Sequence, residues 1–229
     1  LTYMKSDIQS FPDHKIRLKP GNPLIGTDIE VPGDISSAAY LLAAGCAKKD
    51  SVVIIKNVGI NPTRVGFIDI LKEMGAKVEL ENQKNVSNEP RADIKIEGAL
   101  LNGIQIDKKT IAGIIDELPL VAVIATQAQG KTVVKDAREL RVKETDRIKA
   151  IVESLASMGA KITEREDGFE VQGPTELTGS IVNSYHDHRI AMSLAIAASY
   201  AKGKTVIHDT QCMDVSYPGF MQAFYEIIR

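Results

Sequence analysis

The sequence has few cysteines, no excess of positive charge and no long apolar run. Cys46 and Cys212 lie far apart without metal-ligand spacing, so we interpret each as a small buried apolar residue rather than a ligand or disulfide partner. The formal net charge of −2 argues against binding to nucleic acid or to a membrane surface, since both need basic residues in excess. No apolar run approaches the roughly 18–20 residues that span a membrane.

The N-terminal residues, Leu-Thr-Tyr-Met-Lys-Ser-Asp, are too polar for a signal peptide. Together with the cysteine usage, this predicts a protein of the reducing cytoplasm. Hydrophobic residues make up 44% and charged residues 25% of the 229 residues, which is the balance of an ordinary globular protein. Because the first residue is Leu1 and not Met, we expect the chain to be part of a longer protein.

An internal repeat runs through most of the sequence. Three times, an extended stretch leads to an Asp, an Ala-rich apolar helix follows, and a short strand comes next. The Asp residues are Asp34, Asp116 and Asp187, and the helices are expected over residues 36–47, 118–128 and 190–201. Because these helices are apolar on all sides, we expect them to be buried.

The first two copies continue with an amphipathic helix and two strands. The amphipathic helices are expected over 63–74 and 143–158, and each ends in Met-Gly-Ala-Lys, where the Gly is a helix C-cap. The third copy stops after its second helix, over 218–228, without the closing strands. The repeat therefore predicts an inside-out α/β (α+β) domain of βαβαββ units, with three buried parallel helices and pseudo-three-fold symmetry.

The first 31 residues stand apart from this repeat. Prolines and glycines divide them into two short strands, so we interpret residues 1–31 as the tail of a preceding N-terminal domain. Residues 32–229 then form a C-terminal domain whose third unit is incomplete. The missing strands are expected from the N-terminal part of the parent protein.

The starts of the buried helices predict an anion site. Helix N-termini carry free N–H groups and a partial positive charge, and three of them converging would bind anions despite the negative net charge. We interpret Asp34 as a helix N-cap. Asp116 lies in an apolar approach beside Pro119, and it fits a cap and a pocket carboxylate equally well.

The densest group of charges occupies residues 138–147. Such a run is typical of a solvated helix face, but here it lies between a predicted strand and the start of an amphipathic helix. Lys143 and Arg147, four residues apart, are expected on one helix face with Glu144 beside them. Two cations and a carboxylate there could clamp a phosphate or carboxylate and supply an acid–base group.

A second polar group, Tyr-His-Asp-His-Arg at residues 185–189, opens the third buried helix. A metal site at His186 and His188 is disfavoured, because no third His or Cys lies near and alternate residues at a helix start diverge. Arg189 precedes almost wholly apolar turns, so we expect it to bind an oxyanion at the mouth of the helix.

Six stretches in order carry a resemblance that covers essentially the whole chain. They are Pro-Gly-Asp-Ile-Ser-Ser-Ala-Ala-Tyr at 32–40, Asn-Pro-Thr-Arg at 61–64, Asp-Glu-Leu-Pro at 116–119, Arg-Val-Lys-Glu-Thr-Asp-Arg at 141–147, Asp-His-Arg-Ile-Ala-Met at 187–192 and Ser-Tyr-Pro-Gly-Phe at 216–220. In these motifs the chain resembles the EPSP synthases (3-phosphoshikimate 1-carboxyvinyltransferases), whose two domains are built from six βαβαββ units. The chain corresponds to slightly more than the second half of such an enzyme.

The resemblance implies transfer of the enolpyruvyl group of phosphoenolpyruvate to the 5-hydroxyl of shikimate 3-phosphate, with release of phosphate. This is a step of aromatic amino-acid biosynthesis and the target of glyphosate. By motif, Asp116 and Glu144 resemble the catalytic carboxylates. The expected substrate ligands are Lys143 for shikimate 3-phosphate, Arg147 and Arg189 with His188 for phosphoenolpyruvate, and Glu139. No cofactor or metal is implied, and we expect a monomer whose isolated C-terminal part, holding about half of the active site, is inactive.

Two positions depart from the family pattern. Val215 stands where the family often has a Lys, and Glu139 where many members have Asn. Two other functions remain open. One is the related enolpyruvyl transferase that acts on UDP-N-acetylglucosamine, which the motifs at 141–147 and 187–189 disfavour. The other is a non-catalytic anion-binding domain, which the retained charged residues disfavour.

Overall fold

Three buried helices form the centre of the fold in the computed structural model, which describes residues 1–13 and 15–228. They are α1 (Ile35–Cys46), α4 (Leu118–Ala125) and α6 (His188–Tyr200), and they pack against one another. Every residue of α4 is buried, as is α6 from Ile190 to Ala197. The prediction of three buried helices is confirmed, because a helix that is apolar on all sides is stable only inside a core.

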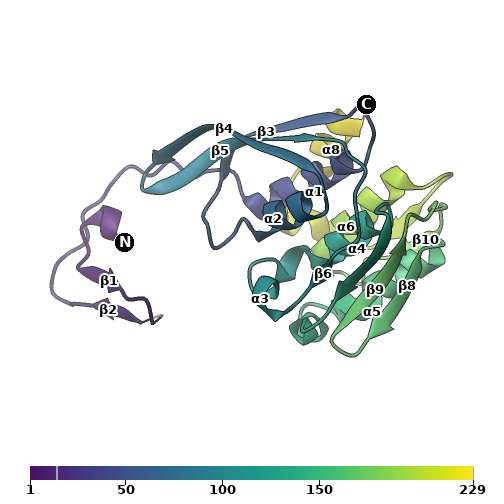
Figure 1. Cartoon of the computed structure of the whole chain (residues 1–229). Coiled ribbons are helices and arrows are strands. Elements are labelled where there is room, and N and C mark those ends of the chain that lie inside the picture. The colour runs from purple at the N-terminus through teal and green to yellow at the C-terminus, as the bar shows by residue number, and fades with distance from the viewer. Residues whose placement is uncertain (14, 229) are drawn as a thin grey trace.

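Two sheets lie outside these helices, on different sides of them (Figure 1). The first contains β3 (Val52–Gly59), β4 (Lys77–Val86) and β5 (Glu89–Glu97) in the antiparallel order β3-β5-β4. The second contains β6 (Gln105–Ile106), β7 (Gly130–Val134), β8 (Lys161–Arg165) and β9 (Gly168–Gly173) in the order β6-β7-β9-β8.

The strand register reproduces the repeat. In each unit the extended segment before the buried helix pairs in parallel with the strand after it, as in β6 with β7 and β10 (Ile181–Asn183) with β11 (Val206–His208). In the first unit this pairing is a single bridge, Gly33 with Val58. A closing strand then pairs antiparallel in the first two units, β5 on β3 and β9 on β7. Among the described residues, β10 and β11 form a two-stranded sheet without such a strand.

Amphipathic helices cover the outside, and all three begin later than predicted. They are α2 (Gly66–Glu73), α5 (Arg147–Ser157) and α8 (Phe220–Ile228). The side chain of Asp146 caps α5 by accepting from the Lys149 N–H, so the helix starts at Arg147 and not at residue 143. Lys143 has extended backbone after the 3₁₀ helix Arg138–Val142. The prediction that Lys143 and Arg147 share a helix face was therefore wrong.

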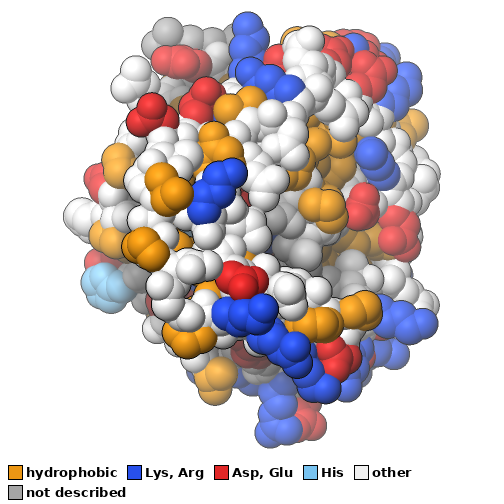
Figure 2. Space-filling view, turned by 90° about the vertical axis from the view of Figure 1, so that its left-hand side faces the viewer, with side chains coloured by type: hydrophobic (Ala, Val, Ile, Leu, Met, Phe, Trp, Pro, Cys, Tyr) orange, Lys and Arg blue, Asp and Glu red, His pale blue; other side chains and the backbone are white. Residues whose placement is uncertain are grey.

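The first residues form a hairpin, β1 (Ile8–Ser10) with β2 (Ile16–Leu18), that lies away from the helices (Figure 1). Figure 2 shows this side of the molecule, where apolar side chains are scattered over the surface. Those exposed between residues 16 and 31 are Ile16, Leu18, Leu24, Ile25, Ile29 and Val31. In the described ranges, no helix has the length and apolar character needed to cross a membrane.

Candidate active site

The N-termini of the three buried helices meet, but they are capped in different ways. Asp34 caps α1 by accepting from the Ser37 N–H at 2.7 Å. Asp187 caps α6 by accepting from the N–H groups of Arg189 and Ile190. Asp116 lies in the 3₁₀ helix Ile115–Glu117 just before α4, and its side chain caps nothing. The interpretation of Asp116 as a cap is therefore wrong, and its role as a pocket carboxylate stays a prediction.

Arg147 is the centre of the site and is only 1% exposed. Its Nε donates to Asp187 at 2.7 Å, its Nη2 to Glu144 at 2.6 Å and its Nη1 to Asp116 at 3.1 Å. Three segments far apart in the sequence therefore meet on one guanidinium group. A buried charge is tolerated only when it is paired and hydrogen-bonded, so these contacts fix the arrangement.

Arg189 lies beside this cluster and is held less tightly. Its contacts with the Asp116 carboxylate, the Asp116 carbonyl and the Glu117 carboxylate measure 3.3, 3.2 and 3.3 Å. Its side chain is 15% exposed. Arg189 is therefore the guanidinium of the pair that an anionic ligand can reach more readily.

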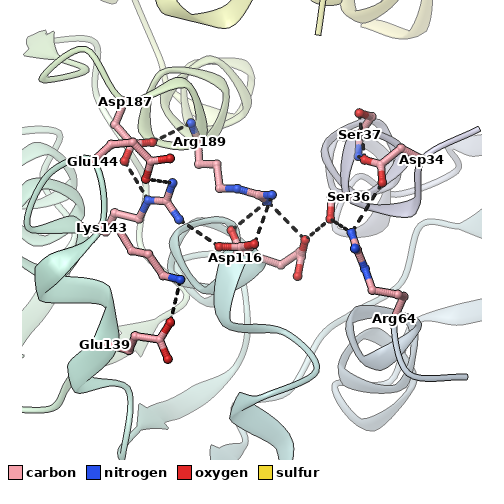
Figure 3. A network of polar contacts seen from close by, with 12 residues as sticks. Asp34, Ser36, Ser37, Arg64, Asp116, Glu139, Lys143, Glu144, Asp187 and Arg189 are labelled. Carbon is pink, nitrogen blue, oxygen red and sulfur yellow. Dashed lines mark hydrogen bonds and ion pairs between the residues drawn. The ribbon is translucent and has the colours of Figure 1, made fainter. Parts of the chain in front are cut away.

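Lys143 and Glu139 form a neighbouring pair (Figure 3). Lys143 Nζ donates to the Glu139 carboxylate at 2.7 Å, in a contact four residues apart. Asp116, Glu144, Arg147 and Arg189 are thus directly linked, whereas no hydrogen bond of this network joins Lys143 to them. Val215 lies in the short helix α7 (Met213–Ser216) with its side chain 86% exposed.

His188 is the first residue of α6 and is partly buried at this cluster. Burial lowers the pKa of His188 below its usual 6.5; Asp187 opposes this shift, and Arg189 and Arg147 add to it. The imidazole is therefore neutral at pH 7, where it can donate and accept hydrogen bonds. His186, by contrast, is exposed in a turn with left-handed backbone.

The lowered pKa predicts a pH dependence of stability. The unfolded chain takes up a proton at His188 near pH 6.5, whereas the folded chain resists it, so the free energy of unfolding falls as the pH drops below about 6.5. His188→Gln removes this contribution and should flatten that part of the profile. Urea unfolding of both proteins between about pH 8 and about pH 5 measures it. Identical pH profiles would contradict the assignment.

Sequence reasoning did not single out Glu117, Ser36 and Arg64. Glu117 is buried, and it accepts from the Ser36 hydroxyl at 2.6 Å. Arg64 in turn donates to Ser36 at 3.2 Å. Each of the three residues lies inside a motif, and that position was the one signal in the sequence. For Glu117 even this signal was weak, because an acidic residue at a helix start normally indicates capping.

Both cysteines are free, and they differ in burial. Cys46 is fully buried, and burial raises the pKa of its thiol to about 12. The prediction of a buried apolar role is confirmed for Cys46. Cys212 is only partly buried, because it lies in a surface 3₁₀ helix, Thr210–Cys212.

The architecture is that of the enolpyruvyl transferases. It superposes with a TM-score of 0.79 on the enolpyruvyl transferase NikO from Streptomyces tendae, over 99% of this chain and 51% of that chain. The sequence identity of 16% means that this likeness concerns the fold alone. An EPSP synthase from Acinetobacter baumannii superposes with a TM-score of 0.95 at 39% identity, over 99% of this chain and 53% of that one.

Sequence comparison identifies the family within this class. The family model of EPSP synthase (3-phosphoshikimate 1-carboxyvinyltransferase) matches residues 1–224. A 3-phosphoshikimate 1-carboxyvinyltransferase from Thermoanaerobacter sp. (strain X514) is 50% identical over 210 residues, which are 92% of this chain and 50% of the relative. The chain belongs to the EPSP synthase family. It spans about half the length of the curated relatives that it matches.

Proposed function

We propose that the protein containing this chain transfers the enolpyruvyl group of phosphoenolpyruvate to the 5-hydroxyl of shikimate 3-phosphate and releases phosphate. The observation that carries the proposal is the pair of partly exposed carboxylates, Asp116 and Glu144, held on the buried guanidinium of Arg147. Family membership supports the choice of substrates.

The reaction needs groups of this kind. In the addition, the attacking hydroxyl loses a proton and the methylene of phosphoenolpyruvate gains one. In the elimination, the bond to phosphate breaks and the new methyl group loses a proton again, so both a base and an acid are required. Asp116 and Glu144 take these roles, Asp116 at the hydroxyl and Glu144 at the methylene. Both carboxylates contact Arg147 and therefore lie close together. They can then exchange protons with one phosphoenolpyruvate and one shikimate 3-phosphate bound side by side.

The cations divide the other tasks. Arg189 contacts phosphoenolpyruvate, with the neutral His188 beside it, because its partly exposed guanidinium is the less tightly held of the two. Lys143 binds the phosphate of shikimate 3-phosphate. Glu139, whose carboxylate accepts from Lys143 at 2.7 Å, stays a predicted substrate ligand beside it. Arg147 acts chiefly on the two carboxylates, and a contact of Arg147 with phosphoenolpyruvate remains a prediction.

The other half of the site comes from an N-terminal domain in this proposal. The relatives are about twice as long as this chain, and residues 1–31 expose apolar side chains that such a domain would cover. Residues 32–229 then form the C-terminal domain of a monomeric cytoplasmic enzyme. Closure of two half-sites excludes water and strengthens each charge contact, so the chain alone should show no turnover.

A phosphate-release assay tests the proposal. The chain alone and the chain joined to the N-terminal half of the Thermoanaerobacter relative are each given phosphoenolpyruvate with shikimate 3-phosphate. We expect turnover only from the joined protein. The control acceptor is UDP-N-acetylglucosamine, which should give none. Turnover with that acceptor instead, or no turnover by a correctly folded joined protein, would reject the assigned reaction.

A further inference from the structure

Glu117 is a buried carboxylate that the proposed proton transfers do not use. Its Oε1 accepts from the Ser36 hydroxyl at 2.6 Å and from Arg189 Nη1 at 3.3 Å. Its side chain does not cap α4, although it occupies the capping position. Burying a carboxylate costs free energy unless its oxygens are hydrogen-bonded, so these two contacts define what holds Glu117 in place.

The contacts of Glu117 link all three repeat units. Ser36 lies in the first turn of α1 and also accepts from Arg64, which follows β3. Glu117 precedes α4, and Arg189 lies in the first turn of α6. Figure 3 shows the network running from Asp34 and Arg64 through Ser36 toward Arg189 and Asp116. Glu117 thus connects Arg189 to the first unit.

Neighbouring groups hold the guanidinium of Arg147 more firmly than that of Arg189. Arg147 makes three carboxylate contacts of 2.6 to 3.1 Å and is buried. The contacts of Arg189 with Asp116 and Glu117 measure 3.2 to 3.3 Å, and its side chain lies partly in solvent. A long, loosely held side chain loses conformational entropy when it binds a ligand. A partner that orients Arg189 beforehand therefore raises its affinity for an anion.

We propose that Glu117, fixed by Ser36, is a positioning residue that orients the Arg189 guanidinium for the anionic groups of phosphoenolpyruvate. The choice of phosphoenolpyruvate as ligand rests on the proposed function, to which this proposal adds a role for Glu117. Two effects of Glu117 oppose each other. Its hydrogen bond orients Arg189, whereas its negative charge repels an incoming anion. Variants that separate geometry from charge decide which effect dominates.

Glu117→Gln keeps an oxygen that can accept from Ser36 and Arg189 but removes the charge, and Glu117→Ala removes both. If orientation dominates, Glu117→Ala weakens phosphoenolpyruvate binding by about tenfold, the loss expected for one charge-assisted hydrogen bond, and Glu117→Gln restores binding to within about twofold. Ser36→Ala should weaken binding by about threefold. It should add little to Glu117→Ala, because Ser36 acts through Glu117.

The dissociation constants of phosphoenolpyruvate and inorganic phosphate are measured on the 229-residue chain by titration calorimetry. KM for each substrate is measured on the joined protein. We expect KM for phosphoenolpyruvate to rise and KM for shikimate 3-phosphate to stay constant. Binding by Glu117→Ala as tight as by the parent, or equal losses in the Ala and Gln variants, would overturn the proposal. So would equal rises of both KM values, which indicate a merely structural role.

The test still gives an answer if Glu117→Ala does not fold or if the joined protein shows no turnover. If Glu117→Ala fails to fold, Ser36→Ala and Glu117→Gln carry the same test, since each leaves an acceptor near Arg189. If the joined protein shows no turnover, the proposed function fails, but the calorimetric comparison still tests the role of Glu117. Unchanged binding in Ser36→Ala together with unchanged binding in Glu117→Ala rejects the role independently of turnover.

Discussion

Replacing Asp187 with Ala should lower the free energy of unfolding by about 3–5 kcal/mol, the cost of removing one partner from a buried ion pair. Asp187 is fully buried, and its Oδ2 accepts from Arg147 Nε at 2.7 Å. Its Oδ1 accepts from two N–H groups at the start of α6. The substitution thus removes a helix cap and leaves a buried guanidinium with two partly exposed partners.

Asp34→Ala is the matched control for Asp187→Ala. Asp34 caps α1 at the same place in the repeat, but within residues 1–13 and 15–228 its one cation contact is exposed, at 3.5 Å from Arg64. Its loss should cost about 1 kcal/mol, the usual value of an N-cap. Urea denaturation of both variants and the parent gives the two differences. Equal losses would mean that Asp116 and Glu144 alone satisfy Arg147, and that Asp187 is only a cap.

The centre of the fold could be predicted because its signal is local. The apolar residues surround the axes of α1, α4 and α6 on all sides, so burial follows from composition alone. The start of α5 was misplaced because the apolar and charged pattern continues before it. Only the cap at Asp146 marks the boundary, and capping residues also occur inside charged runs.

The site was harder to predict, since its contacts join distant segments. Asp187 reads in the sequence as a cap, and it is one. Nothing in the sequence shows that its second oxygen meets Arg147, forty residues earlier. The burial of Glu117 is equally hidden, because an acidic residue before a helix is usually solvated. The residue types could be selected from motifs, whereas their partners depend on how the three units pack.

Asp116→Asn and Glu144→Gln should each lower kcat of the joined protein by a factor of about 10²–10⁴, the usual contribution of a positioned acid or base. This prediction rests on the proposed function. The two side chains are 40% and 51% exposed, so a ligand can reach them, although Arg147 holds one oxygen of each. An amide cannot exchange a proton with the substrate, but its oxygen can still accept from Arg147.

This choice of variant separates catalysis from folding. Because the hydrogen bonds to Arg147 are kept, the unfolding midpoint should change little, in contrast to Asp187→Ala. KM for phosphoenolpyruvate should change little in Glu144→Gln, since Arg189 keeps its contacts. In Asp116→Asn it should rise, because the amide nitrogen replaces the carboxylate oxygen that lies 3.3 Å from Arg189. Glu73→Gln, an exposed acid on α2, is the control and should retain full kcat. A kcat near the parent value in Asp116→Asn would exclude that carboxylate from proton transfer. The hydroxyl would then have to lose its proton to Glu144 or to a group of the N-terminal half.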